Sequence, residues 1–454
     1  MRMKRGFAVI AGAVVLGVAL QGCSSGGDSS SGAGAVDGKG KTITVYTGVN
    51  TTYPQLQREF EKQVGDDFTK QTGATVVWQH GATANDTLTK IQTSAVSGQG
   101  PDVFDLGTTF TPTAYATGAF VTLDDADWKL VGGKDKFVPA TLGISGPSDS
   151  KQIGVPYQSR PFVLAYNTKL FQDAGLTQPA DTWDGLIAQA KKLTDPSKGV
   201  YGMAIDYKDA LDPWKYVWTF ATQLGNPFIK GAKAHLDDAT VVSAYESYFG
   251  LLTDDHVTDP ASVGWTAPQA LAAFASGKAA ILPMTTSNAT PTLDKSAVKG
   301  DYKYAVMPTV PPGHSSLPSK GVGAASILSG DNLAVADFSP NKSLAFEFVN
   351  YLTSDKIQAE QYQDFGNLPV TKSAAAKLES NAPALAPVLA AGKKSYSTPF
   401  SGAWGDAQVG LLNVVTQSIP DLADGSVSET KIKSLLADAQ DKVTKSLAQA
   451  PQSK

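Results

Sequence analysis

The stretch GVPYQSRPFVLAYNTKLF, residues 154–171, marks the point where the chain passes from one compact region to another. Its apolar run at residues 162–166 has the length and composition of a buried strand, and Asn167 ends that run just before a helix start. Upstream, Gly154 and Pro156 predict a change of backbone direction, because glycine permits unusual dihedral angles and proline fixes one. The stretch is therefore interpreted as a crossover between two lobes.

Length and composition predict a globular protein with more than one core. The chain has 454 residues, whereas domains of about 100 to 200 residues are typical, so two or three are expected. Hydrophobic residues make up 42% and charged residues only 18% of the chain, which is far from the composition of a disordered protein.

The N-terminus has the pattern of an export signal. Three basic residues lie within the first five, and the apolar run at residues 7–20 is shorter than the ~20 residues of a membrane-spanning helix. The sequence LQGC at residues 20–23 resembles a bacterial lipobox, although Gln21 departs from the usual small or apolar residue. Cys23 is the only cysteine, which excludes an internal disulfide. A lone cysteine is commonly a buried small hydrophobic residue, but the place of Cys23 directly after the apolar run predicts lipidation.

The segment after Cys23 predicts a flexible tether. Residues 1–22 are assigned to a lipoprotein signal peptide, and residues 23–40 form a Gly/Ser-rich coil with an expected reach of roughly 20–25 Å. Removal of the signal leaves 35 basic against 42 acidic residues, a net charge of −7. A mildly acidic exported domain without a Lys/Arg cluster is a poor nucleic-acid binder.

From residue 41 onward, strand and helix patterns alternate. Alternating β and α segments of this size predict mostly parallel sheets covered by helices on both faces. The expected strands lie at residues 43–46, 75–78, 103–106, 201–205 and 279–282. The expected helices lie at residues 54–72, 88–96, 182–193, 214–224, 268–276, 340–352 and 427–447.

A series of short motifs in a fixed order resembles a known family. Each motif is weak alone, but together they cover nearly all of residues 41–450. The motifs are GPDV at 100–103, GAFVTLD at 118–124, VPY at 155–157, YN at 166–167, TW at 182–183, AFASGKAA at 273–280 and LPV at 368–370. This order is similar to that of extracellular solute-binding proteins of the maltose-binding class.

The resemblance implies an α/β fold of two lobes, a periplasmic-binding-protein or Venus flytrap architecture, with a ligand cleft between the lobes. It implies a first lobe of residues 41–155 plus 285–335 and a second lobe of residues 156–284 plus 336–454. It further implies a monomeric receptor without cofactor or metal that delivers its ligand to an ABC transporter permease, exported and lipid-anchored through Cys23 at the outer face of the membrane.

Polar loops of the first lobe are the first candidates for ligand contact. In the sugar-binding relatives, loops that follow two strands of the first lobe touch ligand, and these match Thr47, Gly48, Thr108 and Thr109 here. Hydroxyl groups can both donate to and accept from sugar hydroxyls. The alternative is that these threonines only satisfy backbone groups of the turns.

By the same resemblance, Asp212 and Trp214 match an acid-Pro-aromatic triplet whose ring stacks on a sugar, and Trp404 matches a late tryptophan with the same role. The alternative for both tryptophans is a place in the core. Thr286 lies where relatives often carry a tryptophan platform.

Tyr157 and Arg160 complete the candidate set at the crossover. Arg160 falls where maltose-type proteins have an acidic residue. Its guanidinium could bind a ligand carboxylate, phosphate or hydroxyl, or could pair with Asp212 or another acid, and the structural pairing is the favoured interpretation.

Catalytic alternatives find little support. S-x-x-K occurs at residues 148–151 and 339–342 without a following K-T-G, and the four histidines lack the spacing of a metal site. Two carboxylates of a glycoside hydrolase need only meet in space, so a secreted carbohydrate-active enzyme stays open as an alternative. The favoured hypothesis is a non-enzymatic receptor for a small carbohydrate; a polyol phosphate or acidic sugar is the alternative that Arg160 suggests.

Overall fold

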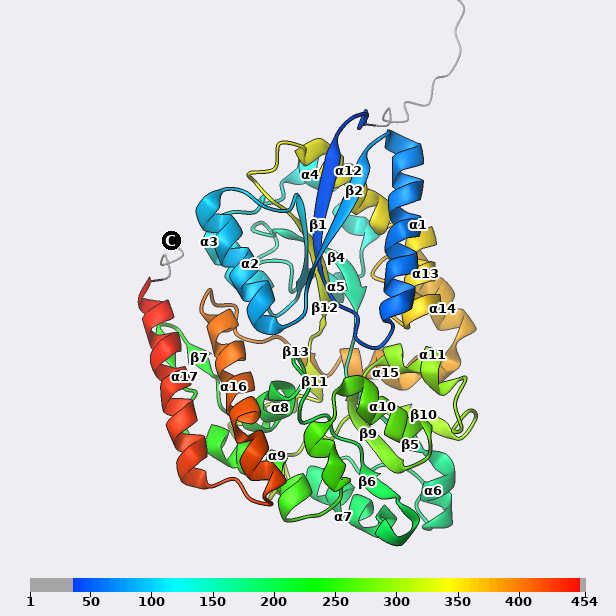
Figure 1. Cartoon of the computed structure of the whole chain (residues 1–454), viewed down its shortest axis with the longest axis vertical. Helices are drawn as coiled ribbons and strands as arrows, with labels where there is room; N and C mark the ends of the chain where they lie inside the picture. Colours follow the sequence, from blue (N-terminus) through cyan, green and yellow to red (C-terminus); the bar gives the residue numbers. More distant parts are fainter. Residues whose placement is uncertain (1–35, 450–454) are drawn as a thin grey trace, which may run out of the picture. The chain divides into compact units, whose positions relative to one another are not determined.

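The structure is a computed structural model of the 454-residue chain and describes residues 36–449. The predicted signal peptide and Cys23 lie outside the described residues. Two sheets organise the rest of the chain, each with helices packed on its faces (Figure 1). We call the part built on the sheet that contains β1 the first lobe and the part built on the other large sheet the second lobe.

The first sheet has the strand order β2-β1-β3-β12-β4. Strands β1, β2 and β3 run parallel, whereas β12 is antiparallel to both β3 and β4. The sheets are therefore mixed rather than mostly parallel, because β12 enters the first sheet from the second lobe. The strands are β1 (Thr42–Gly48), β2 (Thr75–Gly81), β3 (Val103–Gly107), β4 (Gly154–Ser159) and β12 (Gly330–Val335).

The second sheet has the order β10-β5-β9-β6, in which only the β6–β9 pair is parallel. Its strands are β5 (Val163–Asn167), β6 (Tyr201–Met203), β9 (Ala279–Thr285) and β10 (Tyr302–Ala305). Two short ribbons join β11 (Ser326–Ile327) with β13 (Ser395–Tyr396) and β7 (Ile229–Lys230) with β8 (Lys233–Ala234).

The first crossover lies at residues 160–162, between β4 of the first sheet and β5 of the second. The predicted buried strand is confirmed as β5, all of whose residues are buried. The predicted change of direction at Gly154 is wrong, because Gly154 opens strand β4. A side chain there would place its Cβ 2.7 Å from the Cβ of Asn332, so glycine allows β12 to approach.

The sheets divide the chain differently from the predicted ranges. Strand β10 belongs to the second sheet, so the return to the first lobe lies between residues 305 and 330 rather than near 285. The helices α12 (Lys342–Leu352) and α13 (Asp355–Phe365) pack on the core of the first lobe, whereas the family resemblance implies that residues 336–454 belong to the second. The chain crosses back near residues 366–371.

Helices cover both faces of the first sheet (Figure 1). Side chains of α1, α12 and α13 join Ile43 and Val45 in one cluster, whereas α2 and α3 join Tyr46 and Phe104 on the opposite face. The first-lobe helices besides α12 and α13 are α1 (Pro54–Thr72), α2 (Ala84–Ser97), α3 (Thr111–Thr117), α4 (Asp125–Leu130) and α5 (Pro139–Leu142), with the 3₁₀ turn η1 (Lys134–Lys136).

The helix boundaries follow local signals. Helix α1 begins at Pro54 and ends before Gly73, which has a left-handed φ of 79°. Thr83 caps α2 in a reciprocal capping box with Asp86, and Thr182 caps the helix that starts at Trp183.

The other helices follow β5 in the chain. They are α6 (Thr168–Asp173), α7 (Trp183–Leu193), η2 (Pro196–Lys198), α8 (Trp214–Gln223), α9 (Ala239–Thr253), η3 (Pro260–Gly264), α10 (Ala267–Ala275), η4 (Ser287–Ala289), α11 (Thr290–Leu293), α14 (Lys372–Asn381), η5 (Pro383–Leu385), α15 (Ala386–Gly392), α16 (Trp404–Ala423) and α17 (Glu429–Gln449).

Helix α16 links the two lobes through a shared apolar core. It packs against α8 and α17 in the second lobe and against α2 and α3 in the first. The predicted C-terminal amphipathic helix is confirmed as α17, whose buried face carries Ile432, Leu436, Ala439 and Val443. Within residues 36–449, no helix combines the length and apolarity that crossing a bilayer requires.

Candidate functional site

A cavity of about 410 Å³ lies between the loops of the two sheets. Its wall combines polar and apolar side chains from both lobes and from the crossovers. The predicted residues among the lining are Thr47, Gly48, Thr108, Thr109, Tyr157, Arg160, Asp212, Trp214 and Thr286. Trp404 is absent from this wall.

On the first-lobe side, the predicted threonines lie at the ends of β1 and β3. The Thr47 hydroxyl donates to Oδ2 of Asp105 at 2.8 Å, and the Thr108 hydroxyl donates to the carbonyl of Leu328 at 3.1 Å. Thr109 and Gly48 also face the cavity. Both bonded hydroxyls therefore hold the wall together and keep lone pairs for a further donor.

At the crossover, a bulge sets the direction of Tyr157. Asp331 pairs with Gln158 and Asn332 pairs with Pro156, so Tyr157 is the extra residue on β4. Its hydroxyl accepts a hydrogen bond from Nε2 of Gln361 at 2.8 Å. Burial raises the pKa of Tyr157 well above its usual value, so the phenol stays protonated.

Arg160 lies at the same crossover and is held by an acid. Its Nη1 lies 2.6 Å from Oδ2 of Asp331 and its Nη2 donates to Oδ1 at 2.6 Å, while Nη1 also donates to Oε1 of Gln158. This is the two-pronged geometry in which arginine binds carboxylates most strongly. The guanidinium is thus paired structurally, with Asp331 rather than Asp212 as its partner.

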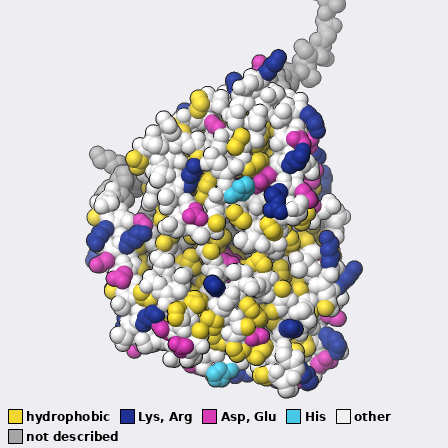
Figure 2. Space-filling model, viewed as in Figure 1, with side chains coloured by type: hydrophobic (Ala, Val, Ile, Leu, Met, Phe, Trp, Pro, Cys, Tyr) yellow, Lys and Arg dark blue, Asp and Glu magenta, His cyan; other side chains and the backbone are white. Residues whose placement is uncertain are grey.

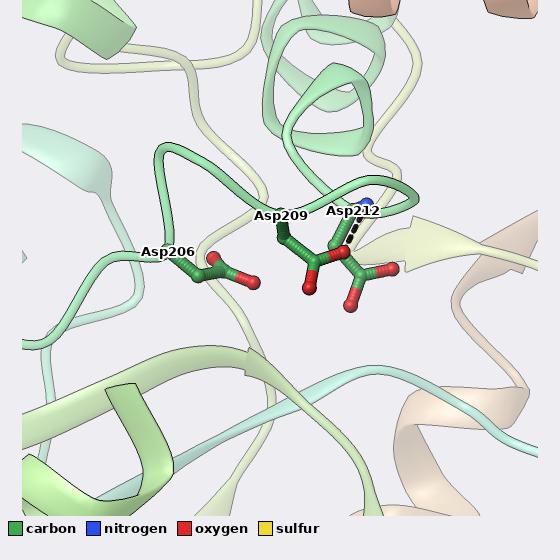
Figure 3. A group of neighbouring side chains, drawn as sticks. All are labelled: Asp206, Asp209 and Asp212. Atoms are coloured by element: carbon green, nitrogen blue, oxygen red, sulfur yellow. Dashed lines mark hydrogen bonds between the residues drawn. The ribbon is translucent and has the colours of Figure 1, made fainter. Parts of the chain in front are cut away.

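On the second-lobe side, the loop between β6 and α8 brings three carboxylates together: Asp206, Asp209 and Asp212 (Figure 3). Asp209 accepts three backbone N–H bonds, from Leu211, Asp212 and Ala267, and so fixes the loop. Asp212 pairs with Lys215 one turn into α8.

The two predicted stacking tryptophans are both fully buried. Trp214 contributes to the cavity wall but has no exposed surface, and Trp404 packs against it with ring centroids 5.9 Å apart. Phe228 makes an edge-to-face contact with Trp404, with ring centroids 6.1 Å apart. The structure thus places Trp404 in the core, because the start of α16 inserts between α8 and the first lobe.

Thr286 caps the short turn η4 beside the cavity. Its hydroxyl accepts from the amide of Asn288 and donates to the Asn288 side chain at 3.0 Å. Two residues earlier, Met284 lines the cavity with a left-handed φ of 51°, which is rare for a residue with a side chain. Such strain is concentrated at functional sites.

Sequence reasoning missed most acids of the cavity. Asp105 lies within strand β3, after Val103 and Phe104, and Asp331 is the second residue of β12, far away in the sequence. Asp206 and Asp209 precede the Asp-Pro-Trp triplet that was recognised. The spacing of three acids at residues 206, 209 and 212 was a signal available in the sequence.

Burial and mutual repulsion raise the pKa of several of these acids. The pKa of Asp206 lies well above its ordinary value because of burial first and then the charges of Asp212 and Asp209. Burial and the neighbouring Asp331 raise the pKa of Asp105 in the same direction. Both shifts stabilise the protonated form of the carboxyl relative to that of an exposed aspartate.

The acidic triad is the group of described residues that comes nearest to a metal site, since oxygen atoms of the three carboxylates lie within 4.8 Å of one another. Two of its members, Asp209 and Asp212, already have partners in the backbone amides and in Lys215. The positive charge of Lys215 also opposes binding of a divalent ion. No metal role is assigned to the triad.

Comparisons with known proteins found similar sequences and similar folds. The diacetylchitobiose binding protein DasA of Streptomyces coelicolor is 28% identical over 88% of this chain and 90% of its own length. A solute-binding protein of Thermotoga lettingae bound to α-D-tagatose superposes with a TM-score of 0.72 at 20% identity, over 89% of this chain and 100% of its own. A solute-binding protein of Agrobacterium radiobacter K84 in complex with ribitol superposes with a TM-score of 0.72 at 23% identity, over 90% of this chain and 99% of its own.

These solved structures share the two-lobed fold of this chain. The family model described as bacterial extracellular solute-binding protein matches residues 53–359, which is most of the described chain. The chain therefore belongs to the family of bacterial extracellular solute-binding proteins.

Proposed function

We propose that this protein is the substrate-binding component of an ABC importer and that it captures a small carbohydrate between its two lobes. The observation that carries the proposal is the cavity itself, whose wall combines hydroxyl, amide and carboxylate groups from both lobes with apolar side chains. Sugars present alternating hydroxyl groups and apolar C–H faces, which such a wall complements.

The relatives support the same ligand class. The curated relative is named for diacetylchitobiose, and the two solved structures hold a ketohexose and a sugar alcohol. An anionic ligand is less favoured, because Arg160 is already neutralised by Asp331. The Lys215 ammonium is likewise paired with Asp212.

Binding is proposed to act through closure of the lobes. Only a closed arrangement lets groups of both lobes contact one ligand, so the ligand favours that arrangement. A membrane permease would then recognise the closed form. On the face shown in Figure 2, basic and acidic side chains are interspersed, which suits specific docking better than adsorption to a polyanion.

The experiment that tests the function is equilibrium dialysis against labelled mono- and oligosaccharides, followed by chromatography of the recovered sugar. Stoichiometric retention of unchanged sugar is expected. Recovery of cleaved or transferred products would show that the protein is a carbohydrate-active enzyme and not a receptor. Retention of none of the sugars would reject the carbohydrate assignment.

We further propose that the receptor is exported, lipid-anchored through Cys23 and monomeric. Cys23 lies outside the described residues, so the support comes from the LQGC pattern after the apolar run. Cys23→Ser is expected to move the protein from the membrane fraction to the soluble fraction of the cell. A variant that stays with the membrane would contradict the anchor, and light scattering of the soluble variant measures the oligomeric state.

A further inference from the structure

The charges that line the cavity do not balance. Six acidic side chains but only two basic ones, Arg160 and Lys215, belong to its wall. Both bases are engaged, Arg160 by Asp331 and Lys215 by Asp212. The acids that remain are Glu61, Asp105, Asp206 and Asp209.

Two of the remaining acids have other partners that offset their charge. Glu61 lies 2.8 Å from Nε2 of His80, and Asp209 accepts three backbone N–H bonds. Asp105 accepts from the Thr47 hydroxyl through Oδ2, while its buried Oδ1 has no partner among the described residues. Asp105 on the first lobe thus retains unmet acceptor capacity.

Asp206, on the second lobe, is the other acid of the wall with unmet acceptor capacity, and its carboxylate has no side-chain partner among the described residues. It is only 7% exposed, and within residues 36–449 its carboxylate takes part in no side-chain hydrogen bond or ion pair. Its carboxylate oxygens keep some accessible surface and Asp206 lines the cavity, so a hydrogen-bond donor of a ligand in the cavity can reach them. Figure 3 shows its carboxylate directed into the same space as those of Asp209 and Asp212.

Lys215, whose charge acts on Asp206, already has a partner. Its ammonium is bound to Asp212 and lies 4.6 Å from the centre of the Phe162 ring, and it makes no ion pair with Asp206 within residues 36–449. Asp206, Asp209 and Asp212 together carry three acidic groups against this one lysine. The burial of Asp206 and the charges of its two acidic neighbours raise its pKa, which agrees with an uncompensated charge.

We propose that the carbohydrate ligand carries a protonated amine and that Asp206 accepts the hydrogen bonds of this ammonium group. An ammonium nitrogen lies about 2.8 Å from a carboxylate oxygen to which it donates. Oxygen atoms of the three carboxylates lie within 4.8 Å of one another, so one nitrogen can contact more than one of them. The inference rests on the proposed function and names its ligand class as amino sugars with a free amine.

The test compares three disaccharides of the same linkage and size by isothermal titration calorimetry, at a pH below the pKa of the sugar amine. These are the β-1,4-linked glucosamine disaccharide, its di-N-acetylated form and cellobiose. The free-amine sugar is expected to bind at least about tenfold more tightly than either neutral sugar. The preference should shrink as salt is added.

Asp206→Asn is expected to abolish the preference, and Asp301→Asn is its matched control. Asp301 is an exposed second-lobe aspartate outside the cavity wall, so the same aspartate-to-asparagine exchange there should keep the preference. A second readout is the proton balance of binding, from titrations in buffers of different ionisation enthalpy. The free-amine sugar should release a proton from the wild type that it does not release from Asp206→Asn.

The outcomes separate this inference from the function on which it rests. If neutral sugars bind and the free-amine sugar binds no more tightly, the ammonium site is wrong while the carbohydrate receptor stands. If none of the three binds but other sugars are retained in dialysis, the amine class is also wrong. If Ca²⁺ alone stabilises the wild type against heat and Asp206→Asn removes this effect, the site binds a metal ion and not an ammonium group.

Discussion

The carboxyl group of Asp206 is buried, so its contribution to the stability of the folded protein depends on pH. Its pKa is raised in the folded protein, so its contribution to stability is fully present below the ordinary Asp pKa of about 4 and is lost as pH rises through the raised value. Asp206→Asn removes this loss. We predict that the ligand-free variant is more stable than the wild type at neutral pH and that the difference disappears in acid.

Chemical denaturation of both proteins over a pH series measures this difference. Asp301→Asn serves as the control, because an exposed carboxylate should change the free energy of unfolding little. A lower stability of Asp206→Asn at neutral pH would show that the carboxylate has a partner that stabilises its charge.

Trp404 is a core residue in this structure, and its substitution should therefore act on stability. The side chain is fully buried and contacts the rings of Trp214 and Phe228. Trp404→Ala is predicted to lower the free energy of unfolding by about 3–5 kcal/mol, as for large buried aromatic residues. Urea denaturation measures it; a loss below about 1 kcal/mol would place the ring outside the packed core.

At the residue scale, sequence reasoning found the cavity where polar side chains follow strand ends. Thr47, Thr108 and Thr109 line it as the motif order implied, although their role in ligand contact stays a prediction. The role of the two tryptophans was harder to predict, because a tryptophan that stacks on a sugar and one that packs in the core can occupy the same position of a helix. Asp105 was missed because its unmet oxygen depends on neighbours that are distant in sequence.

At the element scale, the end of α13 docks against the turn η4 of the second lobe. Gly366 ends α13 with a left-handed φ of 70°, and its carbonyl accepts a hydrogen bond from the Ser287 hydroxyl at 2.6 Å. A Cβ at this position would lie 2.2 Å from the carbonyl oxygen of Ser287. Gly366→Ala is therefore predicted to destabilise the protein by more than about 1 kcal/mol.

Gly425→Ala is the matched control, because Gly425 has φ of 93° but open space around its Cβ position. The control carries the backbone strain without the clash, so thermal denaturation should show a larger loss for Gly366→Ala. Equal losses would mean that the α13–η4 contact adds nothing beyond the backbone effect.

Elements formed by local signals were predicted from sequence, and those formed by distant pairing were not. Pro54 and Gly73 bound α1, and periodicity identified α17, because caps and amphipathic faces are local. Strand β12 pairs with β3 and β4 across more than a hundred residues, so its antiparallel direction was not visible. Strand β4 was mistaken for a turn because Gly154 serves packing rather than a bend.

At the scale of the whole molecule, Tyr53 connects the first lobe directly to the second through its side chain. Its hydroxyl donates to the carbonyl of Asn288 at 2.6 Å and lies 3.0 Å from the Thr292 hydroxyl, both in the second lobe. Tyr53→Phe removes these bonds with little change of volume. We predict a shift toward separated lobes, seen as a larger radius of gyration in small-angle X-ray scattering without ligand.

Tyr302→Phe is the control for this shift, since the Tyr302 hydroxyl donates to Asp294 within the second lobe. It should leave the radius of gyration unchanged. Equal scattering from Tyr53→Phe and the wild type would mean that the hydroxyl does not bias the lobe arrangement.

The two-lobed plan was predicted from the collinear motifs, but the lobe limits were not. They depend on which sheet a strand joins, as with β10, and on which core a helix covers, as with α12. Neither is encoded in the segment itself, because both are decided by packing between parts that are far apart in sequence.

The most direct test of the central claim, that the ligand occupies the cavity between the lobes, is calorimetric titration of a cavity-filled variant. Gly48 lines the cavity, and a Cβ there meets no atom within 4 Å, so Gly48→Trp fills the space without disturbing the backbone. Gly264→Trp is the matched control, with equal room but a position outside the cavity wall. Carbohydrate binding should be lost in Gly48→Trp and kept in Gly264→Trp; wild-type affinity in a folded Gly48→Trp would contradict the account.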